Sequence, residues 1–223
     1  MMPNFPKDLV LILSGVPCVG KTTIAYEFLK QFTEFRRVGE LDVLRTMARA
    51  VADDAIYASG YIGEKKLREY FRPLYYSVSS GDFTVMKQQS EFMVKYIREI
   101  VKRQQARKIP TIIEGSCIVP STYFIEGVPI KDFERNILFV NLYLSDEKEH
   151  LNRRLSRCQE RDYPNDFHAE EKIEKIRDEN IQLHLDTLSL KERVHNVFSI
   201  DTSKLTPDVL VYTIKNIIDS NPF

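Results

Sequence analysis

The sequence has few cysteines and shows no pairing pattern among them. Cys18, Cys117 and Cys158 are far apart in the chain of 223 residues and form no Cys-x-x-Cys pair. This pattern suggests neither a zinc site nor a disulfide framework, and it fits a reducing cytoplasm best. A long apolar segment is also lacking, because the run from Leu9 to Leu13 is too short to cross a membrane or to act as a signal. We therefore expect a cytoplasmic protein without membrane partners.

The chain also lacks an excess of charge of either sign. Lysine plus arginine and aspartate plus glutamate both number 32, so the overall field gives no long-range attraction to nucleic acid or to an anionic membrane. Nucleic acid is not an expected partner, and any site for a polyanion must be local. Internal repeats and low-complexity tracts are absent as well. The length fits one domain, residues 1–223, with its own core.

One stretch organises the rest of the chain. A strand-like apolar run leads into Gly-x-x-x-x-Gly-Lys-Thr and then into a helical pattern, which is the signature of a phosphate-binding P-loop. Backbone N–H groups of such a loop and of the following helix N-terminus form an anion site. We expect Lys21 to reach the β- and γ-phosphates of a nucleotide and the Thr22 hydroxyl to bind Mg²⁺. The expected nucleotide-binding residues of the loop are Gly15, Val16, Pro17, Cys18, Val19, Gly20, Lys21, Thr22 and Thr23.

Cys18 has two interpretations. Its position inside the loop, near Lys21, is compatible with redox control of phosphate binding. A small side chain that the loop merely tolerates is the other interpretation. The sequence leaves both open.

Asp42 is the first candidate carboxylate. A short strand over residues 36–39 would deliver it to the carboxyl edge of a parallel sheet, where ligands bind. There it could orient Mg²⁺ or accept a proton from a substrate hydroxyl. The alternative is that Asp42 caps a helix over Val43–Ala52. Arg45 would share a helix face with Asp42, either as a ligand for an anionic substrate or as a solvated side chain.

Glu114 is the second candidate carboxylate. A long helix is predicted over Thr84–Lys108, and the following run, Thr111–Gly115, is typical of a buried strand that ends in an acid. Such an acid beside a P-loop strand would hold the water bound to Mg²⁺, one strand away from Thr22. A carboxylate that only caps the turn is the alternative.

An arginine cluster follows the next apolar strand, Ile137–Leu144. Four arginines lie within nine residues: Arg153, Arg154, Arg157 and Arg161. A planar guanidinium can bind two oxygens of a transferring phosphoryl group, so the cluster suits a lid over about residues 153–168. We expect one or two of the four to face the nucleotide and others to pair with nearby glutamates; a purely solvated face is the alternative. A second excursion, about residues 53–82, has weak periodicity and suggests a substrate-binding insertion.

The last third of the chain predicts a helix, a strand and a helix. The first helix, Ala169–Leu190, is expected to place Ile173, Ile176, Ile181, Leu185 and Leu188 on one side. A strand from Val197 then delivers Thr202 and Ser203 to a turn that would line the base of the nucleotide. Pro207 opens the terminal helix.

Taken together, these motifs resemble the P-loop small-molecule kinases related to nucleoside monophosphate and shikimate kinases. Within them the chain is most similar to the 2-phosphoglycerate kinase group. The resemblance covers most of the chain and is carried by Gly15–Ala25, Leu41–Arg45, Ile112–Pro120, Ile176–Arg177 and Ile200–Ser203. The stretch Glu-Gly-x-x-x-x-Pro at Glu114 is what points to this group.

The resemblance implies an α/β P-loop NTPase fold with a five-stranded parallel sheet flanked by helices. It also implies ATP and Mg²⁺ as cofactors, and transfer of the γ-phosphoryl group to a hydroxyl of a small anionic metabolite. 2-Phosphoglycerate is one candidate acceptor. The sequence leaves open the acceptor itself, the choice between ATP and GTP, and the oligomeric state.

Other functions use the same motif. A zeta-toxin-like kinase or a polynucleotide kinase would share the P-loop and the acid, and a non-catalytic nucleotide-binding protein would share the P-loop alone. A G protein would need an Asn-Lys-x-Asp motif and an Asp-x-x-Gly switch, and the sequence has neither.

Overall fold

A computed structural model describes residues 5–76, 80–124, 136–160 and 169–221. Its centre is a sheet of five parallel strands in the order β2-β3-β1-β4-β5. This confirms the predicted α/β fold with the P-loop strand in the middle. The strands are β1 (Val10–Ser14), β2 (Val38–Glu40), β3 (Thr111–Gly115), β4 (Ile137–Tyr143) and β5 (Val197–Asp201).

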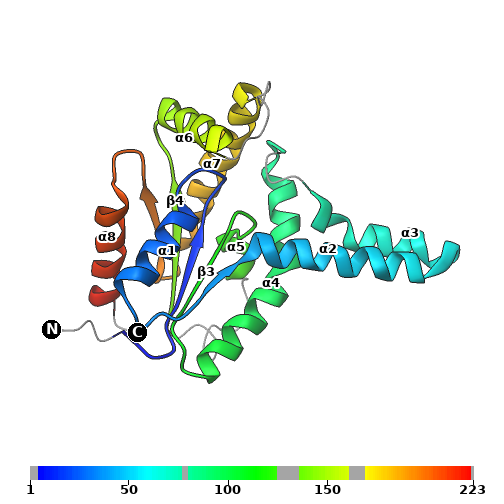
Figure 1. Ribbon diagram of the computed structural model, residues 1–223, viewed down its shortest axis with the longest axis horizontal. Coiled ribbons are helices and arrows are strands. Elements are labelled where there is room, and N and C mark those ends of the chain that lie inside the picture. Colours follow the sequence, from blue (N-terminus) through cyan, green and yellow to red (C-terminus); the bar gives the residue numbers. More distant parts are fainter. Residues whose placement is uncertain (1–4, 77–79, 125–135, 161–168, 222–223) are drawn as a thin grey trace.

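Helices lie on both faces of the sheet (Figure 1). One face is covered by α1 and α8, and the other by α4, α5 and α7. Among the described residues, no helix has the length and apolarity needed to span a membrane. The helical elements are α1 (Lys21–Gln31), α2 (Leu41–Ala58), α3 (Gly60–Phe71), the 3-10 turn η1 (Arg72–Tyr75), α4 (Phe83–Ala106), α5 (Pro120–Tyr123), α6 (Glu147–Glu160), α7 (Ala169–Lys191) and α8 (Pro207–Ser220).

The continuous apolar run of β1 reflects burial on both faces. Leu11 and Leu13 pack into the core beneath α1 and α8, whereas Val10 and Ile12 pack into the core beneath α4 and α5. Successive side chains of a strand point to opposite faces, so a strand covered by helices on both sides needs apolar residues at every position. This burial places the carboxyl end of β1, where the P-loop starts, at the middle of the sheet edge.

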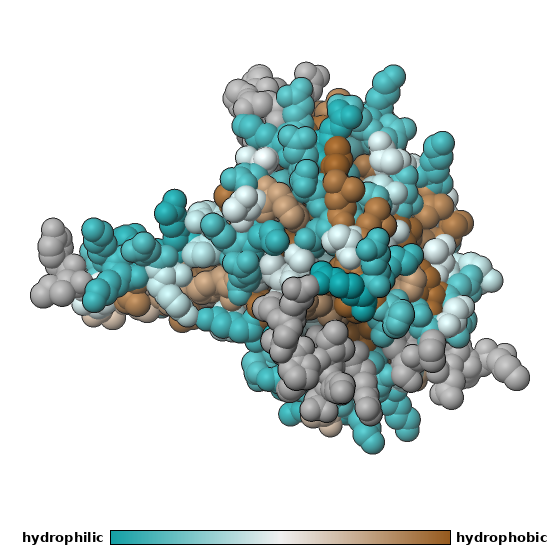
Figure 2. Space-filling view, turned by 180° about the vertical axis from the view of Figure 1, so that it is seen from behind, coloured by the Kyte–Doolittle hydropathy of each residue, from teal (hydrophilic) through white to brown (hydrophobic). Residues whose placement is uncertain are grey.

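Helices α2 and α3 form an arm that projects away from the sheet (Figure 1). Helix α2 runs from Leu41 to Ala58, so it is longer than the predicted helix over Val43–Ala52. The outer part of the arm therefore occupies much of the predicted insertion, residues 53–82. Hydrophobic residues run along one edge of the arm (Figure 2), and Val43, Met47, Val51 and Tyr57 are exposed on α2.

The start of α2 corrects one alternative for Asp42. Glu40 holds the N-cap position, and Asp42 lies inside the first helical turn. An N-cap residue lies outside the first turn, so the interpretation of Asp42 as the cap is wrong. Its carboxylate still favours the positive end of the helix dipole.

The buried face of α7 also differs from the prediction. Ile173 and Ile176 are buried, but Ile181, Leu185 and Leu188 are 43%, 51% and 42% exposed. The buried face instead continues through Asn180, Leu183, Thr187 and Leu190. These positions follow Ile176 at helical steps of three and four. Because Asn180 and Thr187 are polar, a prediction from hydrophobicity alone places Ile181, Leu185 and Leu188 on the buried side instead.

A buried carboxylate joins α7 to the start of α4. Glu179 is 1% exposed, and its Oε1 accepts hydrogen bonds from Ser80 Oγ and Gly81 N, both at 3.0 Å. Its Oε2 has no hydrogen-bond partner in the described part of the chain. Burial raises the pKa of Glu179 to about 7, although the bonds from Ser80 and Gly81 oppose the shift.

We expect Glu179 to make the folded state less stable as pH rises. The unfolded chain loses this proton near its ordinary pKa of 4.5 and the folded chain near 7, so the free energy of unfolding should fall across that window by on the order of 3 kcal/mol. Glu179→Gln should remove this fall, as urea unfolding at pH 5 and pH 8 would measure. Glu174→Gln, exposed on the same helix, is the control. Parallel pH profiles for wild type and Glu179→Gln would contradict the prediction.

Candidate functional site

The P-loop has the curled backbone that its glycines predict. Gly15 and Gly20 have φ values of 145° and 98°, and Cys18 has a φ of 69°. Glycine adopts such values at little cost, whereas Cys18 is a non-glycine residue in the left-handed region. Lys21, at the first position of α1, is buried, and its Nζ donates to Val16 O at 2.9 Å. The lysine therefore lies folded against its own loop.

Glu114 lies beside Thr22, as the strand order requires. β3 pairs with β1, with Glu114 opposite Leu13, and Thr22 Oγ1 donates to Glu114 Oε1 at 3.2 Å. Burial raises the pKa of the Glu114 carboxyl, whereas the Lys21 ammonium and the Thr22 hydroxyl act to lower it. Burial likewise lowers the pKa of Lys21, and the charges of Glu114 and Asp42 oppose that change. The side chains of Lys21, Glu114 and Asp42 therefore form one electrostatic unit.

Two further acids lie at the same edge of the sheet. Asp42 is about half exposed and pairs with Arg45, with 3.4 Å between Oδ1 and NH2. Glu40, which the sequence analysis missed, lies opposite Glu114 in the β2–β3 register and accepts a hydrogen bond of 2.5 Å from Tyr26 Oη. The available signal was its position at the end of the predicted second strand.

A cavity of about 730 Å³ opens beside the P-loop. Its size is within the range of pockets that enclose a small ligand. Several predicted residues line it: Cys18, Val19, Gly20, Lys21, Thr22, Thr23, Arg153, Arg157 and Thr202. Sequence analysis missed others, among them Tyr26, Glu149, Asn152, Ser156 and Pro207. The helical spacing of Glu149, Asn152, Arg153 and Ser156 could have indicated that they share one face of α6.

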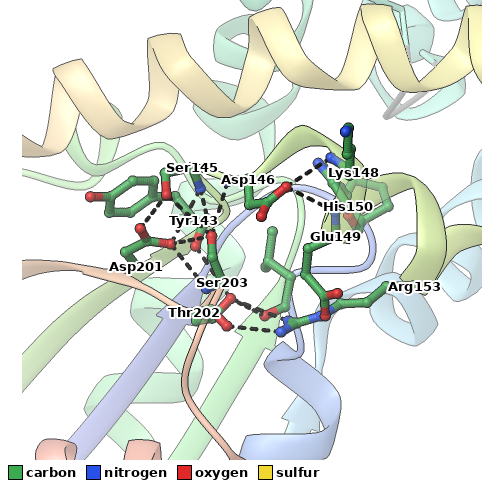
Figure 3. Close-up of polar contacts among 12 residues, drawn as sticks. Tyr143, Ser145, Asp146, Lys148, Glu149, His150, Arg153, Asp201, Thr202 and Ser203 are labelled. Atoms are coloured by element: carbon green, nitrogen blue, oxygen red, sulfur yellow. Dashed lines mark hydrogen bonds and ion pairs between the residues drawn. The ribbon is translucent and has the colours of Figure 1, made fainter.

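Arg153 is held by one partner on α6 and one on the turn after β5 (Figure 3). Its Nε donates to Glu149 Oε1 at 2.7 Å, and its NH2 donates to Thr202 O at 2.8 Å. Thr202 is buried, and its hydroxyl donates to Val19 O at 3.1 Å. Arg153 therefore ties α6 to the turn after β5.

Ser203 points away from Thr202 and toward the start of α6 (Figure 3). Its hydroxyl accepts from Ser145 N and Asp146 N and donates to Asp201. The structure therefore shows Ser203 holding the β4–α6 turn, and its predicted contact with the base stays a prediction.

His150 connects α6 to the P-loop at Pro17. The side chain is 2% exposed, and its Nε2 lies 2.9 Å from Pro17 O. Burial lowers the pKa of His150, and the charges of Arg153, Arg154 and Lys21 act in the same direction. A neutral imidazole that donates from Nε2 satisfies the carbonyl, so His150 braces the loop.

The remaining predicted residues are placed as follows. Arg157 is exposed at the cavity, and Arg154 is half-buried on α6 outside the cavity lining. Arg161 lies outside the described residues, as do the later residues of the predicted lid up to 168. Arg45 is buried at the base of the arm. Cys18 and Cys117 are free thiols, and burial raises the pKa of Cys117 to about 12.

The oxygen donors at Thr22 suit a magnesium ion. A hydroxyl and a carboxylate 3.2 Å apart are hard ligands of the kind that Mg²⁺ takes together with waters and phosphate oxygens. Among the described residues, no three His, Cys, Asp or Glu side chains lie close enough to hold a metal ion by themselves.

Comparison with known proteins supports the resemblance to small-molecule kinases. The chain is 25% identical over 160 residues to a 2-phosphoglycerate kinase of Methanococcus vannielii, covering 70% of this chain and 50% of that protein. It is 24% identical over 214 residues to a 2-phosphoglycerate kinase of Methanococcus maripaludis, covering 89% and 66%. The chain thus spans between half and two thirds of the length of these relatives. No model of a known protein family matches it.

One of the solved structures compared shares the fold. An uncharacterized protein from Eubacterium ventriosum superimposes with a TM-score of 0.50 at 13% identity, covering 96% of this chain and 99% of that one. A shikimate kinase from Acinetobacter baumannii, solved with shikimate, has a TM-score of 0.48 at 16% identity, covering 100% and 97%.

Proposed function

We propose that this chain is an ATP-dependent phosphotransferase that moves the γ-phosphoryl group to a hydroxyl of a small anionic metabolite. One observation carries the proposal. A buried lysine, folded against its P-loop, shares one electrostatic unit with Glu114 and Asp42 beside a cavity of about 730 Å³. Phosphoryl transfer depends mainly on positioning and on charge stabilisation, and this arrangement can supply both.

The P-loop side of the site binds the nucleotide. The loop N–H groups and Lys21 bind the β- and γ-phosphates, in the manner of P-loop proteins. Thr22, with Glu114 through water, would hold Mg²⁺, which neutralises charge on the phosphate oxygens. The Thr22 hydrogen bond and the Lys21 ammonium favour the ionised form of Glu114.

The lid arginines have different roles. Arg153 already donates hydrogen bonds to Glu149 and Thr202, so it holds the cavity wall in place. Arg157 is exposed at the same cavity, and its charge is close enough to act on Lys21. Arg157 is therefore the arginine that we assign to the charge developing on the transferring group.

The acceptor binds on the side of α2. Asp42 orients the acceptor hydroxyl, and Arg45, three residues further along the same helix, binds its anionic group. 2-Phosphoglycerate is the candidate acceptor because the similar curated proteins are named for it. It carries the required hydroxyl together with a carboxylate and a phosphate.

ADP release from Mg-ATP, measured with a coupled assay, tests the proposal. The panel contains 2-phosphoglycerate, glycerate, shikimate, nucleoside monophosphates, UDP-sugars and a short RNA. We expect turnover with one small anionic acceptor, and Asp42→Asn should lower kcat by about 10²–10⁴-fold because the hydroxyl loses its base. Asp54→Asn, exposed on the same helix, is the matched control.

Three outcomes would contradict the proposal. Turnover with RNA alone would indicate a polynucleotide kinase, and turnover with UDP-sugars alone a zeta-toxin-like kinase. ATP binding without any acceptor-dependent turnover would indicate a non-catalytic nucleotide-binding protein.

A further inference from the structure

The base of the arm contains a buried polar network outside the P-loop. Gln89 on α4 is 2% exposed, and its side chain forms three hydrogen bonds to residues of other elements. Its Nε2 donates to Pro73 O at 2.9 Å and to Tyr76 O at 3.2 Å. Its Oε1 accepts from Arg45 NH1 at 3.0 Å. One amide thus joins α4, the turn around η1 and α2.

The Arg45 guanidinium is held at both terminal nitrogens. NH1 donates to Gln89, and NH2 lies 3.4 Å from Asp42 Oδ1. Within the described part of the chain, its buried Nε has no hydrogen-bond partner. A buried guanidinium with an unmet donor has capacity for a further acceptor oxygen.

Arg45 lies in the same electrostatic neighbourhood as the P-loop lysine. Burial raises the pKa of the Cys117 thiol, which lies just after β3. The charges of Asp42, Arg45 and Lys21 all act on that same pKa. Next along α2, Arg49 Nε donates to Leu74 O at 2.5 Å, so a second arginine is bound to the same turn. Carbonyls of the turn around η1 therefore hold α2 in two ways. Leu74 O accepts directly from Arg49, and the carbonyls of Pro73 and Tyr76 accept from Gln89, which in turn binds Arg45.

We propose that Gln89 is a positioning residue of the acceptor subsite, where it fixes the orientation of the Arg45 guanidinium toward an anionic group of the acceptor. This inference rests on the proposed function. The amide is suited to the role because it is neutral. It accepts from the arginine without adding a second negative charge to the one that Asp42 already places beside the guanidinium.

Steady-state kinetics of Gln89→Met tests the proposal, with the acceptor that the panel identifies. Methionine keeps the length of the side chain and removes its three hydrogen bonds. We expect the KM for the acceptor to rise by about ten- to a hundredfold, since a displaced binding group costs that much. The affinity for ATP, measured by calorimetry, should change by less than about twofold, because the P-loop is untouched.

Gln104→Met is the matched control. Gln104 is a buried glutamine of the same helix, 5% exposed, and lies about four turns from Gln89. Its substitution removes the same chemical group from the same helix without touching Arg45. Equal effects of the two substitutions on the KM would overturn the proposal, as they would mark a general loss of stability.

A double-mutant cycle with Arg45→Met separates positioning from folding. In the Arg45→Met background, Gln89→Met should raise the KM by less than about twofold, because the group it positions is gone. A rise as large as in the wild-type background would overturn the proposal.

A spectroscopic measurement distinguishes failure of this inference from failure of the proposed function. In protein labelled with ¹⁵N-arginine, the Nη signals of Arg45, identified by their loss in Arg45→Met, should be separate in wild type because both nitrogens are held. In Gln89→Met they should merge, because NH1 loses its acceptor and the 3.4 Å contact of NH2 with Asp42 is then the guanidinium's remaining partner among the described residues. Unchanged signals would overturn the inference even if the chain is a kinase. Merged signals without any turnover would support the positioning role while the proposed function fails.

Discussion

Lys21→Ala should reduce turnover by about a thousandfold or more while the protein stays folded. The lysine is buried, bonded to Val16 O and close to the charges of Glu114 and Asp42. In other enzymes, removal of one preorganised hydrogen-bond donor to a charge that develops in the transition state lowers kcat by roughly 10²–10³-fold. The Lys21 donor also carries a full positive charge. The coupled ADP assay measures the loss, and circular dichroism monitors the fold.

Lys30→Ala is the control for this experiment. Lys30 lies on the same helix, its side chain is 77% exposed, and its partner is Glu27 at 3.6 Å. Exposed pairs of this kind contribute at most about 1 kcal/mol, so both activity and stability should stay near wild type. Near-normal turnover in Lys21→Ala would rule out the proposed phosphoryl transfer.

Gly15→Ala should destabilise the fold by about 3 kcal/mol or more, from backbone strain together with overpacking. Gly15 has a φ of 145°, and a Cβ there would lie 2.4 Å from Leu142 O and 2.7 Å from Val19 Cγ2. The carbonyl belongs to β4, which is paired with β1 on one side and β5 on the other, so it cannot move aside. Urea unfolding measures the change.

Gly20→Ala is the matched comparison within the same loop. Gly20 also has a positive φ, 98°, but no described atom lies within 4 Å of its added Cβ. Only the backbone strain remains, so the cost should be about 1–2 kcal/mol. Equal losses for the two variants would show that the close approach to Leu142 O contributes nothing.

The sheet and the P-loop were predictable from sequence because each has a strong local signal. The strands β1 and β4 are nearly continuous apolar runs, which is what burial on both faces requires. The central position of the P-loop strand and the place of the acid one strand away from Thr22 were also predicted, and the structure confirms both. Chain connectivity rules place the acid-bearing strand next to the P-loop strand, so two residues far apart in sequence could be paired before the structure was known.

The acceptor side was less predictable because its residues act through long-range contacts. Gln89 sits on a helix whose apolar stripe dominates the pattern, and nothing in its neighbourhood signals a bond to Arg45. Glu40 was missed because the second strand has only three residues, too few for a clear boundary. For the outer part of the arm the sequence predicts only an insertion, because Gly60 and Gly63 interrupt the pattern, although the structure shows that both lie within α3.

The position of β1 in the sheet has a consequence for how the chain acquires its structure. Val10 pairs with Thr111 on one side and with Ile137 on the other, so both neighbours of the first strand are synthesised long after it. Contacts so distant in sequence slow folding, because a long loop must close before they form. During translation, we therefore expect β1 to stay without one of its two neighbours, with apolar side chains on both faces, until β4 has left the ribosome.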